Sequence, residues 1–465
     1  MGLGRHIERA SAVALALGVV IAVSALPVAA EGMSASDQMP ASAGWAGVIS
    51  ALLVAVGRRP AVPGRPDDRP PAPVAPVRTV AGIGPVDDIA LSPDGRYAYV
   101  AALRSDRING TEKWTVKVVD TAADAVIKTI DDLSGIIPTS LAASPDASRL
   151  YVADRGAAAI RVVDIQEGSP TRNRIVDTLR LDRSLAVCYG TPTAIALSPK
   201  GSRLYALMTD HAALIVDPET RVLAGTVSGG DSVAMFSAGE HIYVCADDRL
   251  GNTNVAAGVV ILEADTGREL GSFGINDAPA FIRQPILAGS SGQLYLDIDD
   301  LDGRLEVVDT STLKVVSRIT IEASADRQLR SIPSAAALSP DGRCLYVANQ
   351  GVRLSSDEAT EVGWVSVVDT RLNKVVDDIQ LPQSGIDESQ GANPQFIAIS
   401  PAGDRLVVVN EQAIASIVDV ASRSVVSTVT FGEPTDQPRV VVVNPARNAV
   451  YVGTSGEAGL TVISL

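Results

Sequence analysis

The sequence predicts an all-β fold, a single eight-bladed β-propeller built from four-stranded blades. The chain of 465 residues contains 39 glycines and 27 prolines, which is typical of short strands joined by many turns. Seven of its nine tyrosines, and one valine in the same place, recur roughly every 50 residues, a period that indicates a solenoid, propeller or array. The recurring positions are Tyr99, Tyr151, Tyr205, Tyr243, Tyr295, Tyr346, Val407 and Tyr451.

Each repeat contains four strand-like segments, which we call A, B, C and D in chain order. In the sixth repeat they are "AAALSP" (335–340), "CLYVAN" (344–349), "WVSVVDT" (364–370) and "KVVDDIQL" (374–381). A four-stranded unit cannot bury both of its faces alone, so the units must stack. Radial stacking forms a propeller, which also protects the sheet edges.

A short polar turn separates segments A and B. In "LSPDGRYAYVAAL" (91–103) the residues Ser, Pro, Asp and Gly match the preferences of a type I turn, and similar turns follow positions 143, 197 and 338. An acidic residue ends each C segment and is expected to accept hydrogen bonds from the amides of the C–D turn. These residues are Asp120, Asp164, Asp217, Glu263, Asp309, Asp369 and Asp419. Because both motifs recur in every unit, we interpret them as structural; a role as ligand carboxylates is the alternative.

The ends of the repeat region predict how the ring closes. The eighth repeat stops at its C segment, "GLTVISL" (459–465), whereas "APVRTVAGIG" (75–84) is a spare D-like strand before the first A segment. The N-terminal strand is therefore expected to complete the last blade. Seven blades are the alternative, if the irregular fourth or fifth repeat is misread.

The segments "SPDGRCLYVANQG" (339–351) and "VSVVDTRLNKVV" (365–376) resemble the YVTN-type β-propeller repeat of secreted and surface-associated microbial proteins. The resemblance covers residues 77–465 and implies the propeller fold. Family members include surface-layer proteins and other extracytoplasmic interaction modules. Related propellers include lactonases and cofactor-dependent dehydrogenases, so the resemblance leaves the activity open.

The N-terminal region is organised differently. Arg5 and Arg9 precede an uncharged apolar run that ends in small residues, with Val28 and Ala30 at the −3 and −1 positions. This pattern predicts a signal peptide at 1–30; an uncleaved membrane anchor over 10–30 is the alternative. Residues 31–76 are predicted to be a proline-rich disordered linker with a short apolar segment at 45–56. The protein is therefore expected to be extracytoplasmic, whether secreted, periplasmic or bound to the cell wall, with no transmembrane domain in the mature chain.

Charge and cysteine content exclude several classes of protein. A net charge of −15 disfavours nucleic-acid binding, which needs a basic surface. Cys188, Cys245 and Cys344 have spacings that match no zinc or redox motif, and we interpret Cys245 and Cys344 as small buried residues of strands.

The sequence predicts no metal site and no cofactor. Beyond the signal segment there are only two histidines, His211 and His241, which fall in different repeats and are expected at surface turns. The acidic run "DIDDLDGRLE" (297–306) departs from a calcium-binding loop and fits a tight B–C turn, with calcium as the alternative.

Long connections are predicted to lie on one face of the propeller. They are the B–C segments 104–114, 247–258 and 349–363 and the D–A segments 182–192, 322–332 and 382–393. Because A strands line the central channel, residues at their starts should surround its mouth on this face, with the ends of B strands next outward. The predicted binding residues are Asp87, Thr139, Asp154, Arg155, Thr193, Asp231, Arg283, Ser334, Asn349, Gln395, Asn410 and Arg439.

This set is polar, of mixed charge and poor in aromatic residues, so it suits a polar ligand or a peptide better than an apolar molecule; a solvated funnel without a ligand is the alternative. The function that we predict is an exported, non-catalytic interaction module that binds a protein or a polar cell-envelope component through its loop-rich face. A lactonase-like or cofactor-dependent propeller enzyme is the alternative.

Overall fold

The computed structural model describes residues 77–106, 111–130, 137–181, 190–209, 213–227, 231–238, 240–247, 257–275, 282–288, 292–298, 303–321, 329–354, 359–382, 393–457 and 459–465. The predicted signal peptide and linker, residues 1–76, lie outside this set, so both remain predictions. The described residues form strands and turns without a helix, and they therefore include no helix able to cross a membrane.

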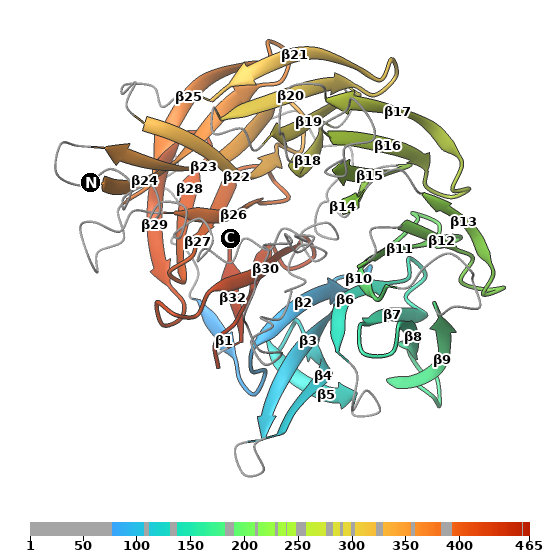
Figure 1. The fold of residues 1–465 in the computed structure, drawn as a ribbon. Helices are drawn as coiled ribbons and strands as arrows, with labels where there is room; N and C mark the ends of the chain where they lie inside the picture. The colour runs from blue at the N-terminus through green and yellow to red at the C-terminus, as the bar shows by residue number, and fades with distance from the viewer. Residues whose placement is uncertain are drawn as a thin grey trace, which may run out of the picture.

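The strands form eight antiparallel sheets of four, arranged in a ring (Figure 1). Blade 1 consists of β2 (Val86–Leu91), β3 (Tyr97–Asp106), β4 (Thr111–Asp120) and β5 (Ala125–Ile130). Blade 2 consists of β6 (Pro138–Ala143), β7 (Arg149–Asp154), β8 (Ala159–Asp164) and β9 (Arg174–Arg180). Blade 3 consists of β10 (Pro192–Leu197), β11 (Leu204–Met208), β12 (Ala213–Val216) and β13 (Leu223–Val227). Blade 4 consists of β14 (Asp231–Ala238), β15 (His241–Asp247), β16 (Ala257–Glu263) and β17 (Glu269–Ile275).

The second half of the ring repeats this order. Blade 5 consists of β18 (Ile282–Ala288), β19 (Gln293–Ile298), β20 (Arg304–Asp309) and β21 (Lys314–Thr320). Blade 6 consists of β22 (Leu329–Leu338), β23 (Cys344–Leu354), β24 (Ala359–Asp369) and β25 (Lys374–Gln380). Blade 7 consists of β26 (Pro394–Ile399), β27 (Arg405–Asn410), β28 (Ile414–Asp419) and β29 (Ser424–Thr430). Blade 8 consists of β30 (Pro438–Asn444), β31 (Ala449–Thr454), β32 (Leu460–Ser464) and β1 (Arg78–Val80).

The predicted eight-bladed fold is confirmed, and the seven-bladed alternative is wrong because the irregular fourth and fifth repeats each form a complete sheet. Ring closure is confirmed as well. The N-terminal strand β1 pairs with β32 through Arg78 and Val462, Thr79 and Thr461, and Val80 and Leu460. The first A strand and the last blade are then packed together by a shared apolar cluster that includes Val80, Ile83 and Tyr451.

Two predicted long connections are in part strand. The B–C segment 104–114 is mostly the extended hairpin of β3 and β4, and 349–363 is mostly that of β23 and β24. In blade 6 the A strand is lengthened too, because β22 begins at Leu329 and pairs with β23 from there. Continued pairing satisfies the backbone groups that an irregular loop would leave to solvent, which explains why the strands continue past the predicted ends.

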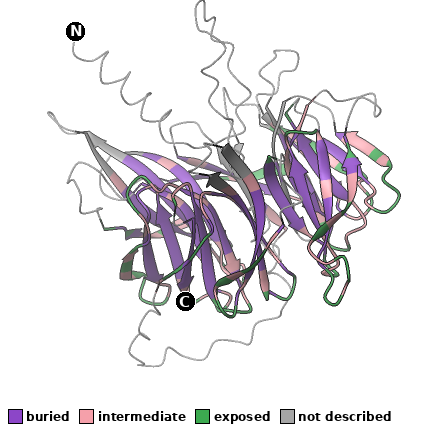
Figure 2. Cartoon of the chain, turned by 90° about the horizontal axis from the view of Figure 1, so that it is seen from below, coloured by how far each residue is buried: buried purple, intermediate pink, exposed green. Residues whose placement is uncertain are grey.

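Apolar clusters join consecutive blades along most of the ring, and Figure 2 shows buried residues along the strands with exposed residues at the turns. The repeated tyrosines belong to this core, with exposures from 0% to 7%. Several hydroxyls also tie one blade to the next. Tyr205 Oη donates to the carbonyl oxygen of Ala264 at 2.7 Å, and Tyr295 Oη donates to Asn373 Oδ1 at 2.7 Å.

The outer strand of each of blades 1 to 7 contains a β-bulge. The C and D strands lose register by one residue, and the unpaired D-strand residues are Ile127, Val176, Ala224, Leu270, Val316, Val376 and Val426. Bulges on an edge strand disturb its row of free backbone groups and so oppose pairing with another chain. The repeated bulge explains how aliphatic side chains such as Val316, 52% exposed, are tolerated at the rim.

Candidate functional site

A β-bulge also lies near the start of every A strand, which is the strand of each blade that lines the central channel. The A and B strands shift register directly after the position that proline occupies in five of the eight blades. The residues skipped by the pairing are Asp87, Thr139, Thr193, Val233, Arg283 with Gln284, Ser334, Gln395 and Arg439. A bulge re-aims the side chain of its extra residue. Because A strands surround the central axis (Figure 1), these residues form a ring at the mouth of the channel.

The ring contains most of the predicted mouth residues. Blade 4 differs, because Asp231 is paired with Asp247 and Val233 takes the bulged place two residues later. Asp231 was predicted as the equivalent position of an irregular repeat, which lacks the proline that precedes the bulge in five other blades. The side chains of Asp231 and Arg283 lie outside the described set.

Three hydroxyl residues of the ring serve the scaffold. Thr139 Oγ1 donates to the carbonyl oxygen of Pro192 in the next blade at 2.9 Å. Thr193 and Ser334 each donate, at 3.1 Å, to a carbonyl oxygen of the B strand in their own blade. These three groups are therefore engaged before any ligand arrives.

The predicted residues at the ends of B strands stabilise turns. Asp154, which is 0% exposed, accepts a hydrogen bond from the Gly156 amide at 3.0 Å and pairs with Arg161, whose Nη2 is 2.8 Å from Asp154 Oδ2. Asn410 Oδ1 likewise accepts from the amides of Gln412 and Ile414. Side chains held in this way cap the B–C turn and have little freedom to contact a ligand.

The remaining two members of this outer set differ from those caps. Asn349 is fully buried; its Nδ2 donates to the carbonyl oxygen of Val347 and to Ser366 Oγ, and its Oδ1 is left without a hydrogen-bond partner. The extended β23–β24 hairpin replaces the turn that Asn349 would otherwise cap. Arg155 is half-buried, and its amide donates to the carbonyl oxygen of Ile137 at 3.0 Å.

Charged and amide side chains remain at the mouth between blades 7, 8 and 1. Glu411 accepts hydrogen bonds from Asn393 Nδ2 at 3.1 Å and from Gln395 Nε2 at 3.5 Å. Arg439 and Asp87 occupy the bulges of the neighbouring blades 8 and 1. Burial raises the pKa of Asp87 to about 6, against the attraction of the Arg439 charge.

Asp88 was not among the predicted site residues. It is 1% exposed, and its Oδ1 and Oδ2 accept from the Ile89 amide at 2.8 Å and from the Leu141 amide of blade 2 at 2.7 Å. Burial raises its pKa to about 7, against the opposing effect of these hydrogen bonds. The carboxylate thus fastens blade 1 to blade 2 beside the channel, as the hydroxyl of Ser140 fastens blade 2 to blade 3 by accepting from the Ile195 amide. In the sequence, Asp88 is the second aspartate of "PVDDIAL". Other repeats have a hydroxyl or apolar residue at the place of Asp88, so the charge there was the signal that could have identified it.

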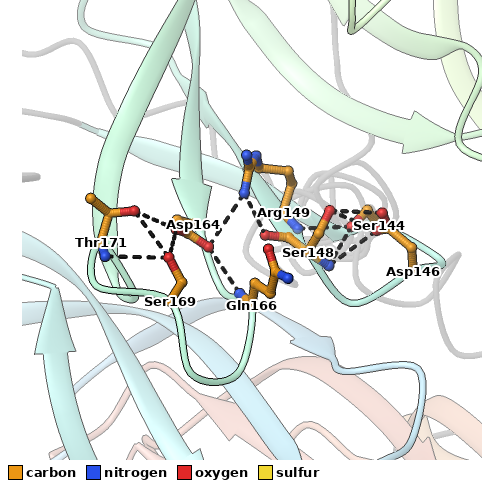
Figure 3. Close-up of polar contacts among 8 residues, drawn as sticks. All are labelled: Ser144, Asp146, Ser148, Arg149, Asp164, Gln166, Ser169 and Thr171. Atoms are coloured by element: carbon orange, nitrogen blue, oxygen red, sulfur yellow. Dashed lines mark hydrogen bonds and ion pairs between the residues drawn. The ribbon is translucent and has the colours of Figure 1, made fainter.

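The opposite face, which we call the turn face, is formed by the A–B and C–D turns. Figure 3 shows it in blade 2, around residues 144–149 and 164–171. Ser144 Oγ donates to Asp146 Oδ1, and Asp164 accepts from the Gln166 amide and from the Ser169 and Thr171 hydroxyls while pairing with Arg149. The same pattern recurs at Asp120, Asp217, Asp309, Asp369 and Asp419. The predicted structural role of both turn motifs is therefore confirmed.

Other predicted features give no site in the described residues. No group of three or more histidine, cysteine, aspartate or glutamate residues in that part of the chain could hold a metal ion. His241 begins β15, edge-on to the Tyr243 ring, whereas His211 and Cys188 lie outside the described residues. Of the acidic run, 299–302 lies outside as well. Cys245 is a buried free thiol, and Cys344 is free and partly buried.

One comparison with known proteins supports a β-propeller. No family model matches the chain. A stretch of 156 residues is 29% identical to the seven-bladed β-propeller protein Rv1057 of Mycobacterium tuberculosis (strain ATCC 25618 / H37Rv), and the match covers 33% of this chain and 33% of that protein. The chain thus matches about one third of the length of that relative, whose name gives one blade fewer.

Among solved structures, a chain of Kuenenia stuttgartiensis hydrazine synthase is similar over 83% of this chain and 97% of its own length, with 16% identity and a TM-score of 0.48. A likeness at that level carries no argument about function.

Proposed function

We propose that this protein is an exported, non-catalytic β-propeller of the YVTN type that binds a protein or a polar cell-envelope component through its loop face. The loop face is the end of the ring where A strands start and B strands end, near Asp87, Asp154, Gln395 and Arg439. Export is supported by the signal-like residues 1–30, and an acidic chain of net charge −15 argues against nucleic acid as the partner.

The observation that carries the proposal is the difference in how the two faces use repeated positions. On the turn face six of the eight blades place an aspartate at the end of the C strand, where it accepts hydrogen bonds from the amides of its own turn. On the loop face the bulge is repeated in every blade, but the residue in it changes from acid to hydroxyl, amide or guanidinium. A rigid scaffold that presents different side chains at equivalent places is the usual arrangement of a binding surface.

The chemistry of these residues favours a polar partner. The described ring residues are charged, amide or hydroxyl side chains apart from the Val233 position, and apolar ligands instead require pockets lined by aromatic and aliphatic groups. Gln395, Glu411, Arg439 and Asp87 are only partly buried, so part of each residue is exposed to solvent.

The test is capture of an envelope partner by the full-length protein, followed by a comparison of variants. We expect Arg439→Ala and Gln395→Ala to weaken binding of the captured partner about tenfold, because the first loses a charge-assisted hydrogen bond and the second an amide hydrogen bond. Asp309→Ala on the turn face is the matched control and should leave binding unchanged. Binding that survives both loop-face variants but is abolished by trimming 349–363 would place the site on the outer rim instead.

An enzyme is the second candidate, and one observation favours it. Asp87 and Asp88 are adjacent carboxyl groups whose pKa values burial raises to about 6 and about 7, a range suited to proton transfer at neutral pH. Hydrolysis of a panel of lactones by the wild type, lost in Asp87→Asn, would establish this function. Equal background rates for both proteins would dismiss it.

A further inference from the structure

The bulges of blades 8 and 1 place opposite charges side by side at the channel mouth. Arg439 lies in the bulge of β30 and Asp87 in that of β2, at equivalent positions of neighbouring blades whose A strands pack against each other. The two side chains are close enough for Arg439 to lower the pKa of Asp87. They form no ion pair within 4 Å, unlike the pairs that Asp154, Asp217 and Asp419 make with arginines elsewhere in the described residues.

One polar atom of Arg439 lacks a hydrogen-bond partner. Its Nε is buried and has no hydrogen-bond partner. A buried polar atom without a partner costs free energy, and a guanidinium group presents a planar fork of donors that matches a carboxylate. A carboxylate brought by a ligand would pair with the guanidinium through its terminal Nη groups, since Nε itself is buried.

A simple anion is a poor match, however. The protein carries a net charge of −15, and Asp87 lies near Arg439 in the neighbouring strand, with the second carboxyl group of Asp88 next to Asp87. A ligand that brings a positive charge next to its carboxylate is attracted by both members of the pair and is not repelled by the acidic surroundings.

We propose that Arg439 and Asp87 bind a zwitterionic α-amino-acid group, with the ligand carboxylate on Arg439 and its ammonium group on Asp87. This inference rests on the proposed function and names the chemical class of its polar ligand. The group could belong to a free amino acid or to an amino acid carried by a larger envelope polymer, because both present the same two charges on one carbon atom.

The experiment is a calorimetric titration of the full-length protein at pH 8 with L-alanine, propionate and ethylamine, and with dextran carrying L-lysine through its side-chain amine. We expect L-alanine, the lysine dextran or both to bind. If L-alanine binds, whether or not the dextran also binds in its own titration, the ligand is a free amino acid. Binding of the dextran alone indicates a polymer-borne group. Binding should fall about tenfold or more in Arg439→Gln and in Asp87→Asn, because each removes a charge-assisted contact. Arg447→Gln on the turn face is the matched control.

The pH dependence separates this ligand from a plain carboxylate. The charged groups around Asp87 are Arg439 of β30 and Asp88 of its own strand, and β6 on the other side presents the neutral Thr139. As pH falls from 8 to 5.5, Asp87 becomes mostly neutral, whereas the propionate probe stays mostly ionised. Affinity for L-alanine should then decrease, whereas affinity for propionate should increase.

Three outcomes would overturn the inference: no binding of either amino-acid probe, binding that is unchanged in both variants, or an affinity for L-alanine that rises with acidification as propionate does. The proposed function is judged separately. If an envelope partner is captured through the loop face while the amino-acid probes fail, only this inference falls.

Discussion

Aspartates on the two faces of this propeller have opposite properties. On the turn face, a hydrogen bond from the Thr220 amide holds the pKa of Asp217 below its usual range, and bonds from the Ser311 side chain and the Thr312 amide do the same for Asp309. At the channel, burial raises the pKa of Asp87 to about 6 and that of Asp88 to about 7. One residue type is therefore stabilised as an anion at one end of the blade and destabilised as an anion at the other.

This difference separates the structural residues of the repeat from the candidate functional ones. The turn-face aspartates recur in nearly every blade and are satisfied by their own turns, so they stabilise the unit. The channel aspartates occur once, in blade 1, and their charge is only partly compensated. A polar residue that recurs at the same place in each blade is therefore expected to be structural. A backbone feature that recurs in each blade but holds a different side chain each time is expected to be functional.

Replacing Asp154 should destabilise the protein more than the other substitutions below. Asp154 lies on the loop face, yet its contacts are those of a structural residue. We expect Asp154→Ala to lower the free energy of unfolding by about 3 kcal/mol, since Arg161 would lose its buried partner. Urea denaturation measures this. The matched control is Asn410→Ala, a neutral cap in the equivalent place, for which about 1 kcal/mol is expected. Equal losses in the two variants would show that the ion pair is unimportant.

The pH dependence of stability tests the raised pKa of Asp88 beside the channel. The pKa of Asp88 in the folded protein lies above the value of about 3.9 in an unfolded chain. Its contribution to stability is therefore present below the unfolded value and is lost as pH rises through about 7. Between pH 5 and pH 8 we expect Asp88 alone to lower the free energy of unfolding by about 2.5 kcal/mol, and this part of the decrease to disappear in Asp88→Asn.

Thermal and urea denaturation of both proteins at the two pH values measure this change. Asp87 acts in the same direction, so a smaller decrease should remain in the variant. Asp217 and Asp309 on the turn face, whose pKa values are lowered, lose their stabilisation only in more acidic solution. An unchanged slope in Asp88→Asn would contradict the assignment.

Asp164 tests the turn face itself. Its carboxylate accepts hydrogen bonds from three groups of its own turn and pairs with Arg149 (Figure 3), so Asp164→Ala should cost about 1.5 kcal/mol in urea denaturation. Asp309→Ala removes the same cap without an arginine partner and should cost less. Neither variant should alter ligand binding on the loop face, and a binding defect in Asp164→Ala would break the division between the faces.

Tyr205 gives the smallest expected effect. Its hydroxyl donates to the carbonyl oxygen of Ala264 in the next blade, so Tyr205→Phe should cost about 1 kcal/mol. Tyr151→Phe is the matched control, because the Tyr151 hydroxyl makes no hydrogen bond to a described residue, and its stability should be unchanged. If both substitutions are neutral, the repeated tyrosine is selected for its ring alone.

Much of the fold could be predicted because its signals are local and repeated. The turn in "SPDG", the acid that ends each C strand and the tyrosine column each lie within a few residues of the structure that they specify, and eight copies reinforce one another. The spare strand at 75–84 and the missing D strand at the end also predicted ring closure, since an unpaired edge strand must find a partner.

The surroundings of the candidate site residues could not be predicted as well, because burial and hydrogen-bond partners depend on contacts between distant residues. Asp154 and Asn410 were predicted as ligand contacts, yet the structure uses them as caps. Asp231 is paired rather than bulged, because register in an irregular blade depends on both strands. The extended hairpin of blade 6 appeared as a loop because its sequence lacks a clear strand pattern.

By itself the sequence determined the propeller fold, the closure of the ring and the residues that form the turns, because each of these follows from short-range propensity repeated along the chain. Only the tertiary structure decided what the single aspartates and arginines do. Asp87, Asp88 and Arg439 differ from Asp154 and Asp164 in the partners that neighbouring blades bring to them. Those partners lie tens to hundreds of residues away in the chain, and desolvation at the channel depends on the whole ring.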